Sequence, residues 1–238
     1  PDHRGSRLLN SEPGAGKLAA GLADGLQALG LSLSATQQTQ LIEYLALLGR
    51  WSKVYNLTAV REPDAMLTHH VLDCLAVVQP LRAMLDRRWP GWREPPAGTP
   101  LRLLDVGSGA GLPGVILAIA CPELQVDCVD AVAKKAAFVQ QTAAQLKLAN
   151  LWGVHARVES LSQPYTVITS RAFAALADFV TWTDKALMDG GIWLAMKGQE
   201  PSGEMREIPG TVSVFHVEPI AVPGLNASRC LIWMQRTP

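Results

Sequence analysis

Hydrophobic residues follow two different patterns along this chain, and the pattern changes near residue 100. Before that point apolar side chains recur every three or four positions, which is typical of helices with one buried face. The spacing predicts helices over residues 17–29, from Ser34 through Trp51, and from Pro63 to about residue 85. Ser34 with Gln37 three positions later forms a capping box, and Pro63 suits the first turn of a helix.

Beyond residue 100, short apolar runs of strand length alternate with helical patterns. Strands are expected at 101–106, 124–130, 151–158, 165–170, 191–196, 211–218 and 229–235, and helices at 113–121, 132–147 and 174–187. Strands that alternate with helices form parallel sheets, whereas the last two strands have little helix between them. The pattern therefore predicts an α/β fold of Rossmann-like type: a seven-stranded mixed sheet with an N-terminal helical extension.

Composition divides the chain into four segments. Residues 1–16 are expected to be a disordered leader, 17–88 a helical region, 89–100 a linker rich in proline and glycine, and 101–238 the sheet domain. The run Pro13–Lys17 superficially resembles a phosphate-binding loop, but no strand pattern precedes it.

Charge gives no overall sign of a nucleic-acid partner. The 21 Lys and Arg residues balance 21 Asp and Glu residues, so the formal net charge is zero. Basic residues are nevertheless concentrated between Tyr44 and Arg61 and between Arg82 and Arg93. Each concentration is either an RNA contact or a solvated helix face.

Cysteine usage and hydropathy suggest a cytoplasmic protein. The four cysteines include no C-x-x-C pair and have no histidine at metal-ligand spacing, so we expect no metal and a reduced compartment. The chain has no long apolar run and no secretory h-region near residue 1, so no membrane partner is expected. We expect a monomer.

The glycine-rich segment that follows the first strand carries the strongest chemical signal. Gly107, Gly109 and Gly111 stand at alternate positions between a strand and a helix, which is the nucleotide-binding corner of a doubly wound sheet. The segment also satisfies the dinucleotide fingerprint G-x-G-x-x-G, with Asp130 about twenty residues further on.

Asp105, two positions before the first glycine, decides between the two cofactors. A carboxylate is unfavourable where a pyrophosphate must approach a helix N-terminus. It suits a cationic ligand, or it anchors the loop by accepting backbone N–H bonds. The pattern Asp-x-Gly-x-Gly-x-Gly resembles the first motif of class I S-adenosylmethionine-dependent methyltransferases, so S-adenosylmethionine is favoured over NAD(P).

Ligands of open α/β sheets bind beyond the carboxyl ends of the strands, so the residues that follow each strand are candidates. Asp130 suits the ribose hydroxyls better than Asp127, which lies inside its strand. Val158 and Glu159 suit the adenine edge; the alternative for Glu159 is an acidic residue at a helix start.

Basic side chains follow the later strands. Arg171, after Ser170, could bind the cofactor carboxylate, an RNA phosphate or the guanine carbonyl oxygen. Lys197 is a phosphate contact or an ordinary exposed lysine. We expect Arg50, Lys53, Arg171 and Lys197 to contribute an RNA affinity that falls with salt.

Several short motifs together resemble the GidB (RsmG) family, bacterial methyltransferases that modify a guanine at N7 in small-subunit ribosomal RNA. They are Asn56-Leu57-Thr58 after Trp51 and Tyr55, His70-Val-Leu-Asp73, the glycine loop with Leu112-Pro113-Gly114, and Ser170-Arg171-Ala172-Phe173. The resemblance runs from about residue 30 to the C-terminus. It implies 16S ribosomal RNA or the small ribosomal subunit as partner.

Residue roles carried over from this resemblance concern both ligands. Cofactor contacts are implied at Gly107, Leu112, Val158, Glu159 and Arg171, whereas Asn56, His70 and Asp73 would line the mouth of the site. The chain departs from the family pattern at His69, at Thr166 and over Asn226–Cys230, where only Arg229 is retained. These departures bear on RNA affinity more than on the methyl transfer.

His70 and Asp73 lie three residues apart and share a helix face, as a general base and its orienting group would. Guanine N7, however, has a free in-plane lone pair and needs no base. We therefore expect this pair to position RNA or to lock the helical region to the sheet. Two other functions stay open: a methyltransferase for a small molecule or protein, and an RNA-binding assembly factor.

Overall fold

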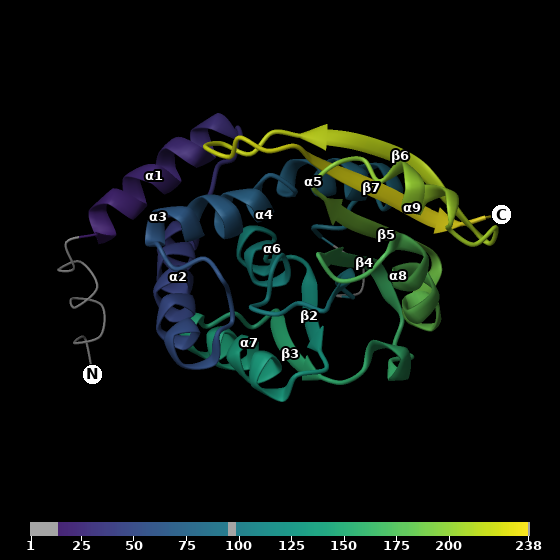
Figure 1. Ribbon diagram of the computed structural model, residues 1–238, viewed down its shortest axis with the longest axis horizontal. Helices are drawn as coiled ribbons and strands as arrows, with labels where there is room; N and C mark the ends of the chain where they lie inside the picture. Colours follow the sequence, from purple (N-terminus) through teal and green to yellow (C-terminus); the bar gives the residue numbers. More distant parts are fainter. Residues whose placement is uncertain (1–13, 95–98, 238) are drawn as a thin grey trace.

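The computed structural model describes residues 14–94 and 99–237, which fold around one seven-stranded sheet (Figure 1). The strand order is β3-β2-β1-β4-β5-β7-β6. The first five strands are mutually parallel, and β7 runs antiparallel between β5 and β6. The strands are β1 (Arg102–Val106), β2 (Gln125–Asp130), β3 (Leu151–His155), β4 (Tyr165–Arg171), β5 (Leu187–Lys197), β6 (Val212–Ile220) and β7 (Arg229–Arg236). The predicted seven-stranded mixed sheet is confirmed.

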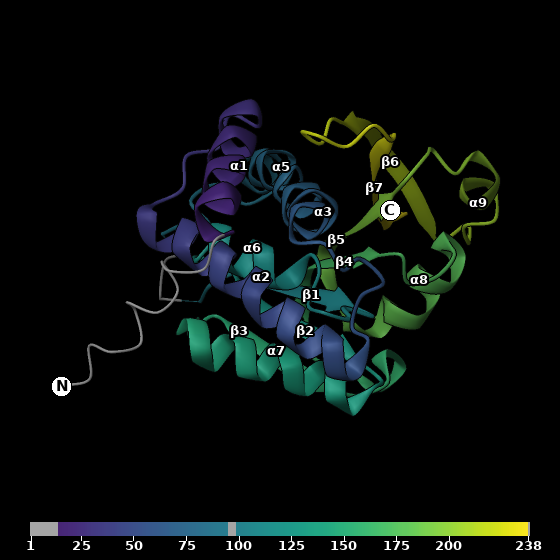
Figure 2. The same cartoon turned by 60° about the vertical axis from the view of Figure 1, so that its left-hand side comes forward.

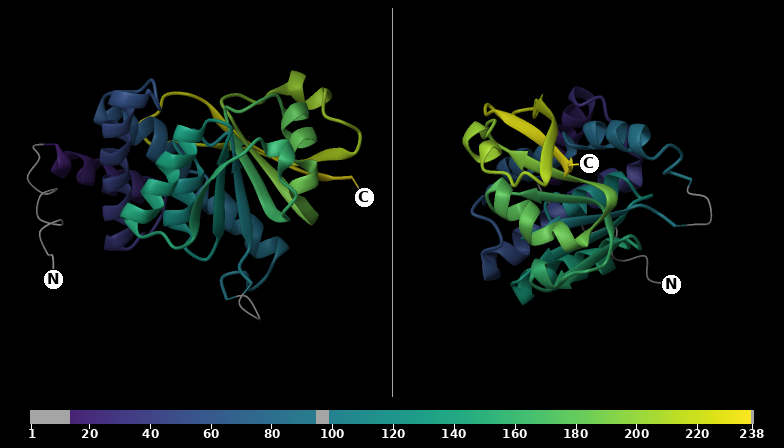
Figure 3. Two further views of the ribbon diagram at one scale, coloured as in Figure 1. Left: turned by 90° about the horizontal axis from the view of Figure 1, so that it is seen from below. Right: turned by 90° about the vertical axis from the view of Figure 1, so that its right-hand side faces the viewer.

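Helices cover both faces of the sheet, which appears as a fan of strands in Figure 3. The N-terminal helices are α1 (Ala15–Ala28), α2 (Ala35–Tyr55), α3 (Pro63–Met66), the π-helix η2 (Leu67–Leu72), α4 (Asp73–Leu75) and α5 (Val78–Arg88). The later ones are α6 (Gly114–Ala120), α7 (Ala133–Leu146), the 3₁₀ turns η4 (Val158–Ser160) and η5 (Asp184–Ala186), α8 (Leu176–Thr183) and α9 (Ser202–Arg206). Within the described ranges, no helix combines the length and apolarity needed to cross a bilayer.

Alternate residues of each strand enter two different hydrophobic cores, as the pleat requires. Leu103 packs with α6, α7 and the N-terminal helices, whereas its neighbour Leu104 packs with α8 and η4 on the other face. Figure 2 shows α2 lying along α7 on the first of these faces.

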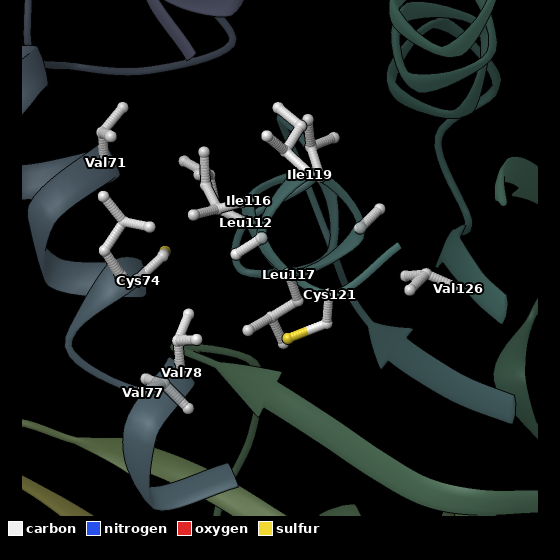
Figure 4. Close-up of a cluster of buried hydrophobic side chains, with 14 of the residues drawn as sticks. Val71, Cys74, Val77, Val78, Leu112, Ile116, Leu117, Ile119, Cys121 and Val126 are labelled. Carbon is white, nitrogen blue, oxygen red and sulfur yellow. The ribbon is translucent and has the colours of Figure 1, made fainter. Parts of the chain in front are cut away.

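The helical region and the sheet share one hydrophobic core. Figure 4 shows Val71, Cys74 and Val78 of the N-terminal helices beside Ile116 and Leu117 of α6, and all five are completely buried. The predicted linker between residues 88 and 101 therefore connects successive elements of the chain, but the helical region and the sheet domain on either side of it do not have independent cores.

Three predicted boundaries were wrong for identifiable reasons. β3 ends at His155 and not at 158, because its partner β2 ends at Asp130, opposite His155. β5 begins at Leu187, because this residue already pairs with Tyr165 of β4, so the Gly190–Gly191 pair expected to open the strand lies inside it, with Gly190 at a φ of +75°. The helix expected over 174–187 is correspondingly shorter, and α9 was not predicted.

The ends of the helical region also differ from expectation. α1 begins at Ala15, so the predicted leader is at least two residues too long; its residues 1–13 lie outside the described ranges. The helix expected from Pro63 does begin there but contains a π-helical turn over Leu67–Leu72. Residues 95–98 of the expected linker also lie outside the described ranges.

Candidate cofactor and substrate site

A cavity of about 440 Å³ opens at the carboxyl ends of β1, β4 and β5, where ligands of open α/β sheets bind. The N-terminal helical region supplies one wall, and the glycine loop supplies another. The lining residues are Leu57, Thr58, His70, Asp73, Gly107, Ser108, Gly109, Ala110, Leu112, Arg171, Ala172, Met196, Lys197, Gly198 and Arg229.

A larger cavity, of about 580 Å³, lies near the amino ends of β2 and β3, away from the carboxyl ends where ligands of open α/β sheets bind, and three of its side-chain amides already have backbone partners. The amides of Gln37, Gln40 and Asn150 donate to backbone carbonyl oxygens of Ile119, Leu146 and Ala118. The cavity beside the glycine loop is therefore the candidate site.

The three glycines of the loop lack a side chain for two different reasons. All three have positive φ, +63° at Gly107, +58° at Gly109 and +80° at Gly111. A Cβ atom at Gly107 would lie 2.2 Å from Phe173, and one at Gly111 would lie 2.4 Å from Val115. A Cβ atom at Gly109 would meet only the Gly107 carbonyl oxygen, at 4.0 Å. Gly107 and Gly111 are thus required by packing, whereas Gly109 keeps the cavity open.

Two carboxylates hold the glycine loop in place by accepting hydrogen bonds from backbone N–H groups. Asp105 Oδ2 accepts a hydrogen bond from the Gly114 backbone N–H at 2.8 Å, and Asp130 Oδ2 accepts one from Gly109 at 3.0 Å. Asp105 is completely buried, so of its two predicted roles the structure supports anchoring and not direct contact with a cationic ligand. Asp127 is turned away, toward Arg102 and Tyr165, which leaves Asp130 as the acidic residue beside the loop.

Burial raises the pKa of Asp105 to about 7, from an ordinary value of 3.8. The folded protein then holds a proton more tightly than the unfolded chain does between about pH 4 and pH 7. Stability contributed by this group is present at low pH and is lost as the pH rises toward 7. The stability contributed by His70 depends on pH in the opposite direction. Burial and the neighbouring Arg171 lower its pKa from 6.5 to about 4, so its contribution is lost as the pH falls toward 4.

Asp105→Asn should therefore gain stability relative to the wild-type protein as the pH rises from 4.5 to 7.5. The isosteric amide can still accept from Gly114 but carries no charge that burial penalises. Urea unfolding at several pH values measures the difference. His70→Gln should show the opposite slope, and a difference that does not change with pH in Asp105→Asn would contradict the raised pKa.

A buried ionic cluster joins the helical region to the sheet. Asp73 accepts from Arg171 of β4 at 2.9 Å and from Arg229 of β7 at 2.7 Å. Arg171 also donates to the backbone oxygen of His69. Two guanidinium groups share one carboxylate, so the cluster carries a net positive charge at the cavity wall. Its contacts support the expected role of locking the two parts together.

His70 and Asp73 do not form a base and its orienting group. His70 Nε2 lies 2.7 Å from Thr58 Oγ1, and both carboxylate oxygens of Asp73 bond to arginines. The lowered pKa keeps His70 neutral at neutral pH. Its contact with Thr58 fixes the segment that follows α2 against the π-helical turn.

The remaining predicted cations are placed differently. Lys197 is not a free phosphate ligand, because it pairs with Glu204 at 2.8 Å and donates to the Ala174 carbonyl oxygen. Arg50 and Lys53 are exposed on α2 outside the cavity lining.

Four more predicted site residues are not among those that line the cavity. Ser170 is buried at the end of β4. Asn56 caps α2 with a φ of 51°, and its side chain accepts from Arg61 at 2.7 Å. Val158 is buried in η4, not in a strand as expected, and Glu159 beside it is exposed.

Arg229 is the main site residue to which sequence reasoning assigned no role. In the sequence it is only the retained member of a degenerate motif over Asn226–Cys230. Antiparallel pairing of Lys197 with Cys230 brings Arg229 to the cavity, and the register of that pairing cannot be predicted from the sequence. Ala172, which lines the cavity with a φ of +53°, belongs to the Ser170–Phe173 motif, but the sequence predicted no role for it.

Comparisons with known proteins agree on one family. The sequence model of the family described as GidB, rRNA small subunit methyltransferase G, matches residues 37–232. The protein named ribosomal RNA small subunit methyltransferase G from Acidovorax ebreus is 58% identical over 214 residues, which cover 90% of this chain and 93% of that protein. The protein of the same name from Albidiferax ferrireducens is 58% identical over 224 residues, 93% of this chain and 98% of that protein.

Solved structures with similar folds are more distant in sequence. TrmN from Thermus thermophilus superposes with a TM-score of 0.50 at 19% identity, covering 68% of this chain and 48% of that one. This likeness concerns the fold alone. The family match, in contrast, spans both the helices and the sheet that build the cavity.

Proposed function

The chain belongs to the GidB family of rRNA small subunit methyltransferases, and from this premise we propose that it transfers a methyl group from S-adenosylmethionine to N7 of a guanine in 16S ribosomal RNA. The match over residues 37–232 carries the proposal, because it includes every residue that lines the cavity. The predicted class I methyltransferase fold, enzyme class and cofactor are confirmed.

The residues around the loop fit S-adenosylmethionine. Gly109 leaves bare backbone toward the cavity, and Asp130 lies beneath it with carboxylate oxygens suited to ribose hydroxyls. Ser108 Oγ and His70 Nδ1, from two lining residues, are buried and have no hydrogen-bond partner within the described ranges. Polar atoms of this kind are available to a ligand. When bound, the cofactor supplies an electrophilic methyl group on a positively charged sulfur.

The chain's own residues align the acceptor base and need not remove a proton. Guanine N7 carries a free lone pair, which agrees with a neutral His70 held by Thr58. Arg171 and Arg229 present guanidinium donors at the cavity wall, and a donor there can bond to the guanine O6 atom. Alignment of this kind supplies much of the rate enhancement in displacement reactions.

Asn56→Ala should lower turnover and leave cofactor affinity unchanged. The side chain accepts a hydrogen bond from Arg61, next to the cavity-lining Leu57, and is itself not among the residues that line the cavity. Calorimetry with the cofactor and steady-state methyl transfer separate the two effects. Asn56→Gly is the matched control, because glycine keeps the left-handed backbone of this position without strain. An effect seen with alanine but not with glycine would contradict a role for the amide.

Methyl transfer from labelled S-adenosylmethionine into small ribosomal subunits tests the proposal. Transfer to a protein or small molecule, with none to RNA, would favour a methyltransferase with another substrate. Cofactor binding without any transfer would favour an RNA-binding assembly factor. A ribosomal substrate also supports a cytoplasmic location. The monomeric state of the protein stays a prediction, which light scattering can check.

A further inference from the structure

Exposed apolar side chains gather where the end of α2 meets the start of α7. Over the described ranges, five large hydrophobic side chains are markedly exposed, and three of them are Val54 (70%), Tyr55 (41%) and Val132 (39%). Lys134 reaches across from α7, with Nζ 5.9 Å from the centroid of the Tyr55 ring. An exposed aromatic ring beside a cation suits a stacked base.

A chain of aromatic rings holds Tyr55 in a fixed relation to the glycine loop. Tyr44 is completely buried and donates its hydroxyl to the Ala110 carbonyl oxygen of the loop, at 2.9 Å. Its ring contacts Phe138, at 6.3 Å between centroids, and Phe138 contacts Trp51 at 5.3 Å. Trp51 contacts Tyr55 at 5.0 Å. Tyr55 is thereby positioned relative to the cavity by a continuous packed path.

The charges around this ring are almost all positive. From Tyr44 to its end, α2 carries Arg50 and Lys53 and no carboxylate, and α7 carries Lys134 and Lys135 and no carboxylate. Lys135 lies 3.6 Å from Asp130, so it is partly neutralised, but Lys134 is exposed and faces the ring. This environment is complementary to the phosphates of a nucleic acid.

We propose that Tyr55 is a stacking platform for a nucleotide that flanks the target guanine, with Lys134 beside that nucleotide's phosphate. The proposal rests on the proposed function, because a base drawn into the cavity leaves its neighbours unstacked. Leu57 lines the cavity and is only two residues from Tyr55, so their Cα atoms are at most about 7.6 Å apart. The platform therefore stands within reach of the adjoining nucleotide.

Steady-state methylation of small ribosomal subunits by the full chain tests this role. Tyr55→Ala should raise KM for the subunits roughly tenfold and leave kcat and the calorimetric affinity for S-adenosylmethionine unchanged. Tyr55→Phe, which keeps the ring, should restore KM. Trp152→Ala is the matched control, because Trp152 is 39% exposed but lies on β3 at the other end of the sheet, beside the larger cavity. Equal KM values for Tyr55→Ala and Trp152→Ala would overturn the platform.

Cross-linking identifies the partner directly. A photoreactive amino acid at position 55 should cross-link to ribosomal RNA within a few nucleotides of the methylated guanine. Cross-linking to a ribosomal protein, or to RNA elsewhere, would overturn the proposal.

Lys134→Met should reduce the slope of log affinity for the subunit against log salt concentration by about one unit. An unchanged slope would contradict the phosphate contact. Failure of the proposed function is distinguishable, because the wild-type chain itself would then methylate no RNA.

Discussion

Gly109→Val is expected to abolish binding of S-adenosylmethionine while the protein stays folded. Only the Gly107 carbonyl oxygen, at 4.0 Å, lies near the position of the new Cβ atom, so the side chain enters the cavity and not the protein. We expect calorimetric affinity to fall by at least about 100-fold, near 2.7 kcal/mol. The left-handed backbone at this residue adds a stability cost of roughly 1–2 kcal/mol.

Gly30→Val separates this loss from backbone strain. Gly30 has a φ of +62°, and no atom lies within 4 Å of the position of its Cβ atom. It follows the C-cap residue Leu29 of helix α1 and is not among the residues that line the cavity. Both variants should lose similar stability in urea, and only Gly109→Val should lose the cofactor. Unchanged cofactor affinity in Gly109→Val would refute this placement of the ligand.

Asp73→Asn should both destabilise the protein and reduce methyl transfer. The carboxylate is 1% exposed and compensates two guanidinium groups, so the amide leaves Arg171 and Arg229 with no opposing charge. Removal of one partner from a buried ionic cluster costs about 3 kcal/mol. Displacement of the two arginines from the cavity wall should also lower kcat/KM by roughly 100-fold. Urea unfolding and labelled-methyl transfer measure the two losses.

Asp86→Asn is the control for this cluster. Asp86 also accepts from an arginine, Arg93, and from the Trp92 indole, but both charged side chains are more than 40% exposed. An exposed pair contributes at most about 1 kcal/mol, so this variant should unfold close to the wild-type denaturant concentration. Equal stability losses in Asp73→Asn and Asp86→Asn would show that Asp73 does not lock the helices to the sheet.

Hydrophobic periodicity predicted the type and order of the elements, because the spacing of apolar residues follows the buried face of each helix and strand. Leu103 and Leu104 face different cores and are both apolar, as expected for a strand of a sheet covered on both sides. The ends of the strands and helices were harder to predict, because they depend on pairing with elements far away in the sequence. β3 stops where β2 ends, and no local pattern around His155 carries that information.

The site was predictable where a local sequence pattern determines the geometry. The glycine loop and its anchor Asp105 belong to one turn, so their spacing is enough to place them. The Arg171–Asp73–Arg229 cluster joins three distant segments, and only Asp73 and Arg171 were candidates beforehand. Lys197 looked like a free cation because its partner Glu204 lies on α9, a helix that the sequence did not predict.

The most direct test of the proposed function is to map the labelled methyl group to one atom of one nucleotide. Small ribosomal subunits that lack the modification are incubated with the chain and labelled S-adenosylmethionine. One portion of the RNA is digested to nucleosides to identify the labelled base, and another portion is left intact and cleaved at N7-methylated guanine to locate it in the sequence. We predict a single N7-methylguanine in 16S ribosomal RNA, absent when Gly109→Val replaces the wild-type chain. Label at another atom or base, or no label in RNA despite measured cofactor binding, would contradict the proposed function.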